Sequence, residues 1–142
     1  MTAPVRLLHA TCVCINGKGV LIMGPSGFGK SDLALRLIDR GAVLVGDDYV
    51  EVHAVNGRLT ADVPERIKGK LEVRGIGLCS FPFQDSATIN LIVRLGETVE
   101  RFPQQLIEEV EGISIPQLRL NAYEASAPNK VELALAQGIG IA

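Results

Sequence analysis

Alternation of apolar and polar positions divides the chain into short strands and two helices, an order typical of an α/β domain. Asn16-Gly17 and Asn56-Gly57 are tight-turn signals, so we expect the strands on either side of each to pair as hairpins. The pattern predicts strands at 6–15, 19–23, 42–45, 49–55, 58–61, 88–95 and 112–120, and helices at 32–40 and 128–137.

Three further segments carry specific expectations. Alternation in the strand 88–95 places three apolar residues on one face, namely Ile89, Leu91 and Val93. The apolar pattern is weaker beyond Gly96. There, residues 97–102 are predicted as an edge strand and residues 104–110 as a surface turn of helix or a loop.

The first helix is preceded by a glycine-rich octet, Gly24-Pro25-Ser26-Gly27-Phe28-Gly29-Lys30-Ser31. This spacing is that of a P-loop, in which glycines let backbone N–H groups converge on a phosphate at a helix N-terminus. Lys30 would add a positive charge toward the β- and γ-phosphates, and the Ser31 hydroxyl would hold Mg²⁺. The alternative is a glycine-rich turn that happens to precede Lys-Ser. The strand before the octet and the helix after it favour nucleoside triphosphate binding.

Composition narrows the class of protein. The length of 142 residues, of which 47% are hydrophobic, suits one domain with a core, so residues 1–142 are predicted as a single P-loop domain with a mixed sheet. Its last residues, 139–142, are expected to fray. A net charge of −2 and an aromatic content of 4% argue against nucleic-acid binding. No apolar run approaches the ~20 residues of a membrane span and no signal peptide is evident, so we expect a cytoplasmic protein.

The three cysteines are Cys12, Cys14 and Cys79, too few for a disulfide framework. In a strand, Cys12 and Cys14 point to the same face, but they offer too few ligands for a closed zinc site. We interpret them as small core residues in a reducing compartment.

Candidate chemistry begins with Asp47 and Asp48, which end the strand that follows the P-loop helix. In an open α/β sheet, ligands bind at that edge. One carboxylate could approach Mg²⁺ while the other accepts a proton from an attacking hydroxyl. The alternative is an ordinary acidic turn. His9 is predicted to approach the same edge, although a lone histidine is more often structural.

Glu72 and Arg74 occupy one face of a short strand, followed by two glycines that permit a loop. In a functional interpretation, Glu72 is a second acid on the metal side and Arg74 is a cation for the phosphoryl charge. The alternative is an ion pair between the two side chains. Spacing alone slightly favours the ion pair.

Taken together, the P-loop, Arg40-Gly41, Gly46-Asp47-Asp48 and the segment Leu71-Glu72-Val73-Arg74-Gly75-Ile76-Gly77 resemble the catalytic domain of HPr kinase/phosphorylase. That family phosphorylates a serine of the phosphocarrier protein HPr in bacterial sugar phosphotransferase systems. The resemblance runs from about His9 to Val93. The sequence resembles a short form of the family that lacks the N-terminal domain of longer members.

This resemblance implies a P-loop fold related to phosphoenolpyruvate carboxykinase, with ATP and Mg²⁺, and a reverse reaction in which phosphate attacks phosphoserine. It implies that Lys30 binds phosphate, that Ser31 and Glu72 hold the metal, and that Asp48 supports it. Asp47 would be the base for the serine hydroxyl, assisted by His9. An HPr-like protein would be the partner, and the family suggests a homo-oligomer.

The family's downstream catalytic arginine is not evident after Gly96, and Arg101 and Arg119 are the candidates for that cation. Two alternatives to the protein kinase stay open. A small-molecule P-loop kinase usually needs an arginine-rich lid, which the sequence does not show. A nucleotide-sensing module without catalysis would not need a base beside the phosphate.

Overall fold

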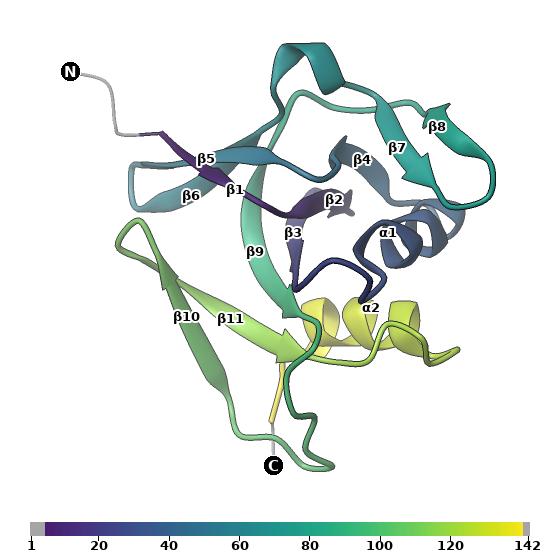
Figure 1. Cartoon of the computed structure of the whole chain (residues 1–142). Coiled ribbons are helices and arrows are strands. Elements are labelled where there is room, and N and C mark those ends of the chain that lie inside the picture. Colours follow the sequence, from purple (N-terminus) through teal and green to yellow (C-terminus); the bar gives the residue numbers. More distant parts are fainter. Residues whose placement is uncertain (1–4, 141–142) are drawn as a thin grey trace.

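The computed structural model describes residues 5–140, arranged as a curved sheet with two helices packed on one side (Figure 1). The first half of the chain forms β1 (Arg6–Leu8), β2 (Thr11–Ile15), β3 (Lys18–Met23), α1 (Lys30–Asp39), β4 (Val43–Gly46), β5 (Val50–Val55), β6 (Arg58–Asp62) and the 3₁₀ turn η1 (Glu65–Ile67). The second half forms β7 (Lys70–Val73), β8 (Gly77–Ser80), β9 (Ser86–Arg94), β10 (Leu106–Val110), β11 (Ile113–Arg119) and α2 (Ala127–Gln137).

The main sheet has the strand order β1-β5-β6-β9-β3-β2-β4, and the β10–β11 hairpin branches from β9. β9 pairs in parallel with β3 and β11, whereas the other pairs are antiparallel. β7 and β8 form a separate two-stranded sheet beside α1. This is the mixed-sheet α/β class expected from the sequence.

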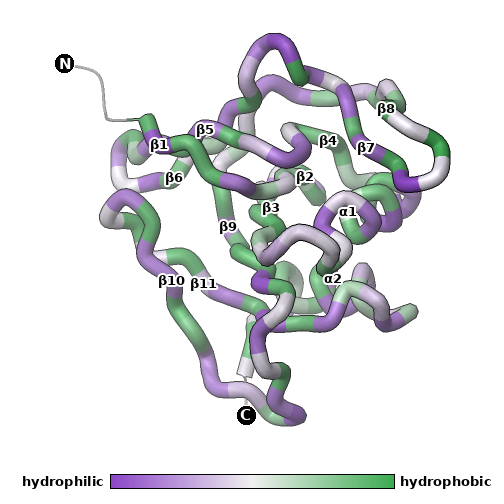
Figure 2. Tube along the Cα trace, in the orientation of Figure 1, coloured by the Kyte–Doolittle hydropathy of each residue, from purple (hydrophilic) through white to green (hydrophobic). Residues whose placement is uncertain are grey.

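Apolar side chains form one core cluster on each face of the sheet. The helix-covered face buries Leu33 and Leu37 of α1 and Val131 of α2 against Ile22 of β3 and Leu91 of β9. The opposite cluster is closed by β1, β5, β6 and the β10–β11 hairpin, and it includes both Cys12 and Cys14. Figure 2 shows mainly hydrophobic colour along β2, β3 and β4 in the middle of the molecule. The two cysteines are therefore core residues, as the sequence indicated.

Both Asn-Gly turns form as predicted. Asn16 and Asn56 have φ angles of 49° and 51°, and the glycine after each also has positive φ. Positive φ at both central residues is the geometry of a tight hairpin turn. The first turn pairs β2 with β3, and Cys14 then faces Gly19 across the ladder.

The predicted strand 6–15 is wrong as a single element. β1 pairs with β5, whereas β2 pairs with β3 and β4, so the chain changes partners between Leu8 and Thr11. The N–H of Ala10 donates instead to the carbonyl of Asp48, 3.0 Å away. This change of partners leaves His9 outside the ladders and beside the turn that follows β4.

The expected common face for Ile89, Leu91 and Val93 is also wrong. Gly19 pairs with Ile89 but the next residue, Val20, pairs with Leu91, which leaves Asn90 as an extra residue in β9. Such a bulge reverses the faces of the residues beyond it. Ile89 accordingly lies in one core cluster, and Leu91 and Val93 lie in the other.

The segments after β9 differ from the prediction as well. Residues 97–102 form no strand, whereas the predicted turn or loop at 104–110 contains the strand β10. Glu108 hid the alternation of apolar and polar residues that predicts a strand. It is a charged residue on the more buried face of β10, where Arg94 binds its carboxylate. The strand 112–120 and the helix 128–137 are confirmed as β11 and α2.

Fraying of residues 139–142 stays a prediction, and the first two of these residues make tertiary contacts. Ile139 packs against the helix-side core, and Gly140 lies so close to the Pro103 carbonyl that a Cβ there would be 2.6 Å from it. Residues 141 and 142 lie outside the described residues. Among residues 5–140, no helix is both long and apolar enough to cross a membrane.

Candidate active site

The predicted P-loop connects the end of β3 to the start of α1. Gly24, Gly27 and Gly29 have φ angles of 156°, 88° and 91°, which L side chains rarely adopt. A Cβ at Gly24 would lie 2.8 Å from the carbonyl oxygen of Leu95. Since α1 begins at Lys30, its first backbone N–H groups have no partner within the helix and are available to an anion.

Lys30 is 8% exposed, and its ammonium group lies beneath the loop. Its Nζ donates to the carbonyl oxygens of Gly24 and Pro25, at 2.7 and 3.3 Å. An ammonium group has three donors, so one is left for a phosphate oxygen. The loop thus holds the charge of Lys30 close to where a phosphate would bind.

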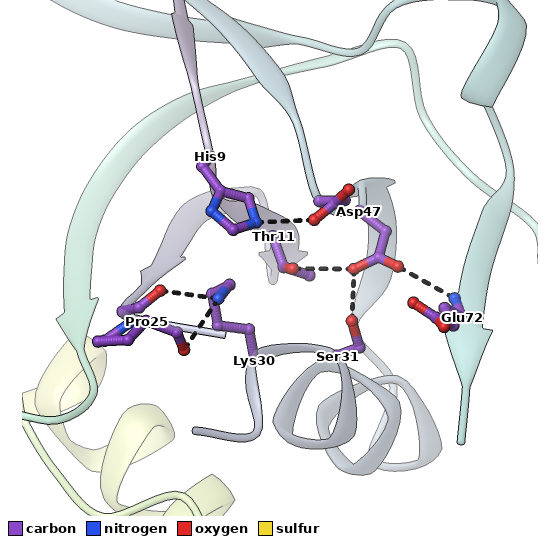
Figure 3. Close-up of polar contacts among 9 residues, drawn as sticks. His9, Thr11, Pro25, Lys30, Ser31, Asp47 and Glu72 are labelled. Carbon is purple, nitrogen blue, oxygen red and sulfur yellow. Dashed lines mark hydrogen bonds and ion pairs between the residues drawn. The ribbon is translucent and has the colours of Figure 1, made fainter. Parts of the chain in front are cut away.

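Asp47 lies under the same helix terminus, 7% exposed, and its carboxylate accepts three hydrogen bonds (Figure 3). The hydroxyls of Ser31 and Thr11 donate to Oδ1 at 2.7 and 2.9 Å. The backbone N–H of Glu72 donates to Oδ2 at 3.0 Å. Asp47 therefore joins three elements, namely α1, β2 and β7, around one buried charge.

Asp48 has a different environment, although it is the next residue. Its side chain is 62% exposed, and its Oδ1 lies 2.8 Å from Nε2 of His9. The His9 ring also lies against Tyr49, with ring centroids 5.2 Å apart. Asp48 has a φ of 70°, a strained value for a residue with a side chain, and this turn directs the two neighbouring carboxylates to different partners.

A cavity of about 520 Å³ opens over this region. The P-loop supplies one wall, Asp48 and His9 a second, and the β7–β8 hairpin a third. Its lining residues are His9, Ser26, Gly27, Gly29, Lys30, Ser31, Asp32, Leu35, Asp48, Glu72, Val73, Arg74 and Tyr123. The fold therefore gathers most of the predicted site residues, which come from distant parts of the sequence, around one space.

Four residues predicted for the site do not line the cavity. Gly24, Pro25 and Phe28 belong to the P-loop, but the first two contribute carbonyls to Lys30, and Phe28 packs near Gly96. Asp47 lies beneath the cavity floor, with its oxygens already bonded.

Glu72 and Arg74 both line the cavity, and both are exposed. The ion pair that the sequence left open between them does not form among the described residues. Arg74 is also the only arginine among the described cavity-lining residues. Neither Arg101 nor Arg119 lines it, and Arg119 instead donates to the side chain of Gln117 at 3.0 Å.

Sequence reasoning missed two polar residues of this region. Thr11 is fully buried, and a polar residue at the head of an otherwise apolar strand was a signal that could have identified it. Tyr123 donates its hydroxyl to the carbonyl of Gly27, across 96 positions of sequence. No local pattern could have revealed that contact.

The residues beside the P-loop suit a magnesium ion that is held partly by protein oxygens and partly by phosphate oxygens. Mg²⁺ prefers oxygen donors and is usually held by one or two carboxylates together with water and phosphate oxygens. Ser31 and Glu72 line the cavity and carry hard oxygen atoms, and Asp47 joins the two residues by accepting from the Ser31 hydroxyl and from the Glu72 backbone N–H. Over residues 5–140 there is no cluster of three or more His, Cys, Asp or Glu side chains, so a dedicated all-protein metal cage is absent.

Comparison with known proteins identifies related sequences and a related fold. A family model described as the HPr serine kinase C-terminal domain matches residues 1–131. The HPr kinase/phosphorylase of Caldicellulosiruptor bescii is 38% identical over an alignment of 131 residues, which covers 82% of this chain and 42% of that protein. The protein of the same name from Nitrosomonas europaea is 38% identical over an alignment of 130 residues, which covers 87% of this chain and 36% of that protein.

Among solved structures, the Hpr(Ser) kinase/phosphatase of Coxiella burnetii matches with a TM-score of 0.81 and 26% sequence identity. The match covers 92% of this chain and 94% of that chain. By contrast, the chain spans less than half the length of the two curated relatives named above.

Proposed function

The chain belongs to the HPr serine kinase C-terminal domain family, and on that premise we propose that it transfers the γ-phosphoryl group of ATP to a serine of an HPr-like phosphocarrier protein. The P-loop supports the nucleotide part of this proposal, since its glycines, Lys30 and helix terminus suit a polyphosphate. The names of the relatives support the protein part.

The observation that carries the mechanism is the different bonding of Asp47 and Asp48. A general base must reach the proton that it removes. Asp47 is buried and its carboxylate already accepts three hydrogen bonds, whereas Asp48 faces the cavity with His9 beside it. We therefore give Asp48 the role of base that sequence reasoning gave to Asp47, and Asp47 the supporting role on the metal side.

In the proposed reaction, Asp48 accepts the proton of the serine hydroxyl as the serine oxygen attacks the γ-phosphorus. The bond from that phosphorus to the β,γ-bridging oxygen breaks, and ADP leaves. His9 orients the Asp48 carboxylate through their 2.8 Å contact. Since phosphoryl transfer depends mainly on positioning and charge, the chief tasks of the protein are to hold these groups in line.

Charge stabilisation falls to Lys30, Arg74 and a metal ion. Lys30 has a free donor for the phosphates, and Arg74 is a cation on the cavity wall. We propose that Ser31 and Glu72 hold Mg²⁺, with Asp47 supporting it through the Ser31 hydroxyl. When bound, Mg²⁺ neutralises charge on the phosphate oxygens.

Because the same carboxylate can return its proton to a leaving serine oxygen, we also propose the reverse reaction with inorganic phosphate, which yields pyrophosphate. Location in the cytoplasm and self-association are further proposals, which follow from the family. Light scattering of the purified protein tests self-association.

The test mixes the purified protein with Mg-ATP and HPr and locates any phosphate by mass spectrometry. We expect phosphate on one serine of HPr, transfer reduced by about 10²- to 10⁴-fold in Asp48→Asn, and ATP binding retained. Asp62→Asn is the matched control, since Asp62 faces His53 at 3.6 Å on β6, in a second Asp–His pair that does not line the cavity. Transfer to nucleotides but not to HPr, or full activity in Asp48→Asn, would contradict the proposal.

A further inference from the structure

The segment Asn121–Ser126, between β11 and α2, lies against the P-loop. Tyr123 lines the cavity, and its hydroxyl donates to the carbonyl oxygen of Gly27. A Cβ at Gly29 would lie 3.2 Å from the Cβ of Ala122 and 3.6 Å from the Tyr123 ring. The segment thus contacts two glycines of the P-loop.

The Gly27–Phe28 peptide is consequently bound at both of its polar ends. Its carbonyl accepts from Tyr123, and its N–H, which belongs to Phe28, donates to the carbonyl of Pro25 at 3.3 Å. Gly27 and Gly29 on either side have positive φ and no side chain that would restrict them. The Tyr123 hydroxyl therefore adds a second restraint to a peptide that the loop itself holds only through the Phe28 N–H.

Arg36 of α1 holds this segment in place. Its guanidinium donates to the carbonyl of Ala122 and, at 3.2 Å, to that of Glu124, on the two sides of Tyr123. Its Nε also donates to Asp32, one turn earlier on the helix, at 3.1 Å. The planar guanidinium can satisfy all three acceptors at once, which a lysine ammonium on a flexible stem cannot do with the same geometry.

We propose that Tyr123 is a positioning residue that sets the P-loop in its phosphate-binding conformation, and that Arg36 acts through it. A loop that is already ordered loses less conformational freedom when a ligand binds, so the contact raises nucleotide affinity. The proposal rests on the proposed function only in taking a nucleotide phosphate as the P-loop ligand.

The test is calorimetric titration with Mg-ATP of the wild type and Tyr123→Phe, which keeps the ring and removes the hydroxyl. Loss of one hydrogen bond predicts about threefold to tenfold weaker ATP binding. Tyr123 is 65% exposed, so we expect the melting temperature of Tyr123→Phe without nucleotide to equal that of the wild type. If Tyr123 had only a structural role, weaker ATP binding would come with a lower melting temperature. Wild-type affinity in Tyr123→Phe would overturn the proposal.

Arg36→Lys and Arg40→Lys form a matched pair one turn apart on α1. Arg40 also reaches the C-terminal part of the chain, through three hydrogen bonds to Glu132 of α2 at 2.7, 3.0 and 3.1 Å, but none of its hydrogen bonds among the described residues reaches the segment that carries Tyr123. We expect weaker ATP binding in Arg36→Lys and wild-type binding in Arg40→Lys. Equal effects of the two substitutions would contradict the role of Arg36.

A double variant tests the coupling directly. If Arg36 acts through Tyr123, adding Arg36→Lys to Tyr123→Phe should weaken ATP binding little further, because interacting residues are not additive. Full additivity would show that the two residues act independently. Since these titrations contain no HPr, a wild type that binds ATP but transfers nothing to HPr would refute the proposed function and leave this inference standing.

Discussion

The hydroxyl of Ser31 donates a 2.7 Å hydrogen bond to the carboxylate of Asp47, and this contact ties the first turn of α1 to the end of β4. The same oxygen atom, Oδ1, accepts a second hydrogen bond from Thr11 of β2. Since Ser31 belongs to the P-loop, the position of the phosphate site relative to the sheet depends on a buried polar network. The contribution of the Thr11 hydroxyl to this network can be tested by substitution.

Thr11→Val should destabilise the fold. The substitution keeps the shape of the side chain but removes the donor to Asp47, which leaves a buried carboxylate with one fewer hydrogen bond. We expect the free energy of unfolding to fall by about 1–3 kcal/mol. Urea denaturation measures this, with Thr60→Val on β6 as the control, and an unchanged midpoint in both variants would show that Asp47 does not need Thr11.

His9→Gln should lower the turnover rate while leaving ATP binding intact. His9 contacts Asp48 but no residue of the P-loop among the described hydrogen bonds, so its loss disturbs the base and not the phosphate site. We expect kcat to fall by about 10- to 100-fold, the equivalent of one hydrogen bond to a charged group. Steady-state kinetics with HPr check this, and a raised KM for ATP at normal kcat would place His9 in nucleotide binding instead.

Arg74→Ala should impair transfer more than binding. Arg74 lines the cavity and has no ion-pair partner among residues 5–140, so its charge is available for the transferred phosphoryl group. Loss of such a donor lowers kcat by about 10²- to 10³-fold. Arg66→Ala in η1 is a control that removes an arginine outside the cavity. Comparable losses in the two variants would point to a general effect of charge.

The Arg94–Glu108 pair should make stability depend on pH in the acid range. Arg94 donates two hydrogen bonds to Glu108 and holds the pKa of that carboxyl below its ordinary value. A lowered pKa in the folded state stabilises the protein above the ordinary value, about 4.3 for glutamate, and this stabilisation is lost as the pH falls through the folded value.

Thermal unfolding between pH 7 and pH 3 checks this effect in the wild type and in Glu108→Gln. The variant should be less stable at pH 7, by on the order of 1 kcal/mol, and the difference should shrink toward pH 3. A constant difference over this range would indicate that the carboxyl charge does not contribute.

Local sequence determined the parts of this protein whose geometry depends on neighbouring residues. Both Asn-Gly hairpins and the P-loop need particular residues at fixed short spacing, because few residues tolerate positive φ and a phosphate needs converging N–H groups. The position of Lys30 and Ser31 between a strand and a helix could therefore be predicted from the sequence, as could the burial of Cys12 and Cys14.

Tertiary structure decided what each side chain faces. The sequence placed Asp47 and Asp48 together at the phosphate edge, but only the folded chain buries one under α1 and turns the other toward His9. The bulge at Asn90 also follows from pairing with β3, a strand far away in the sequence, and the partner of the Glu108 side chain is Arg94 of β9. The contact from Tyr123 to Gly27 joins residues 96 positions apart, and such contacts form only when the fold brings separate segments together.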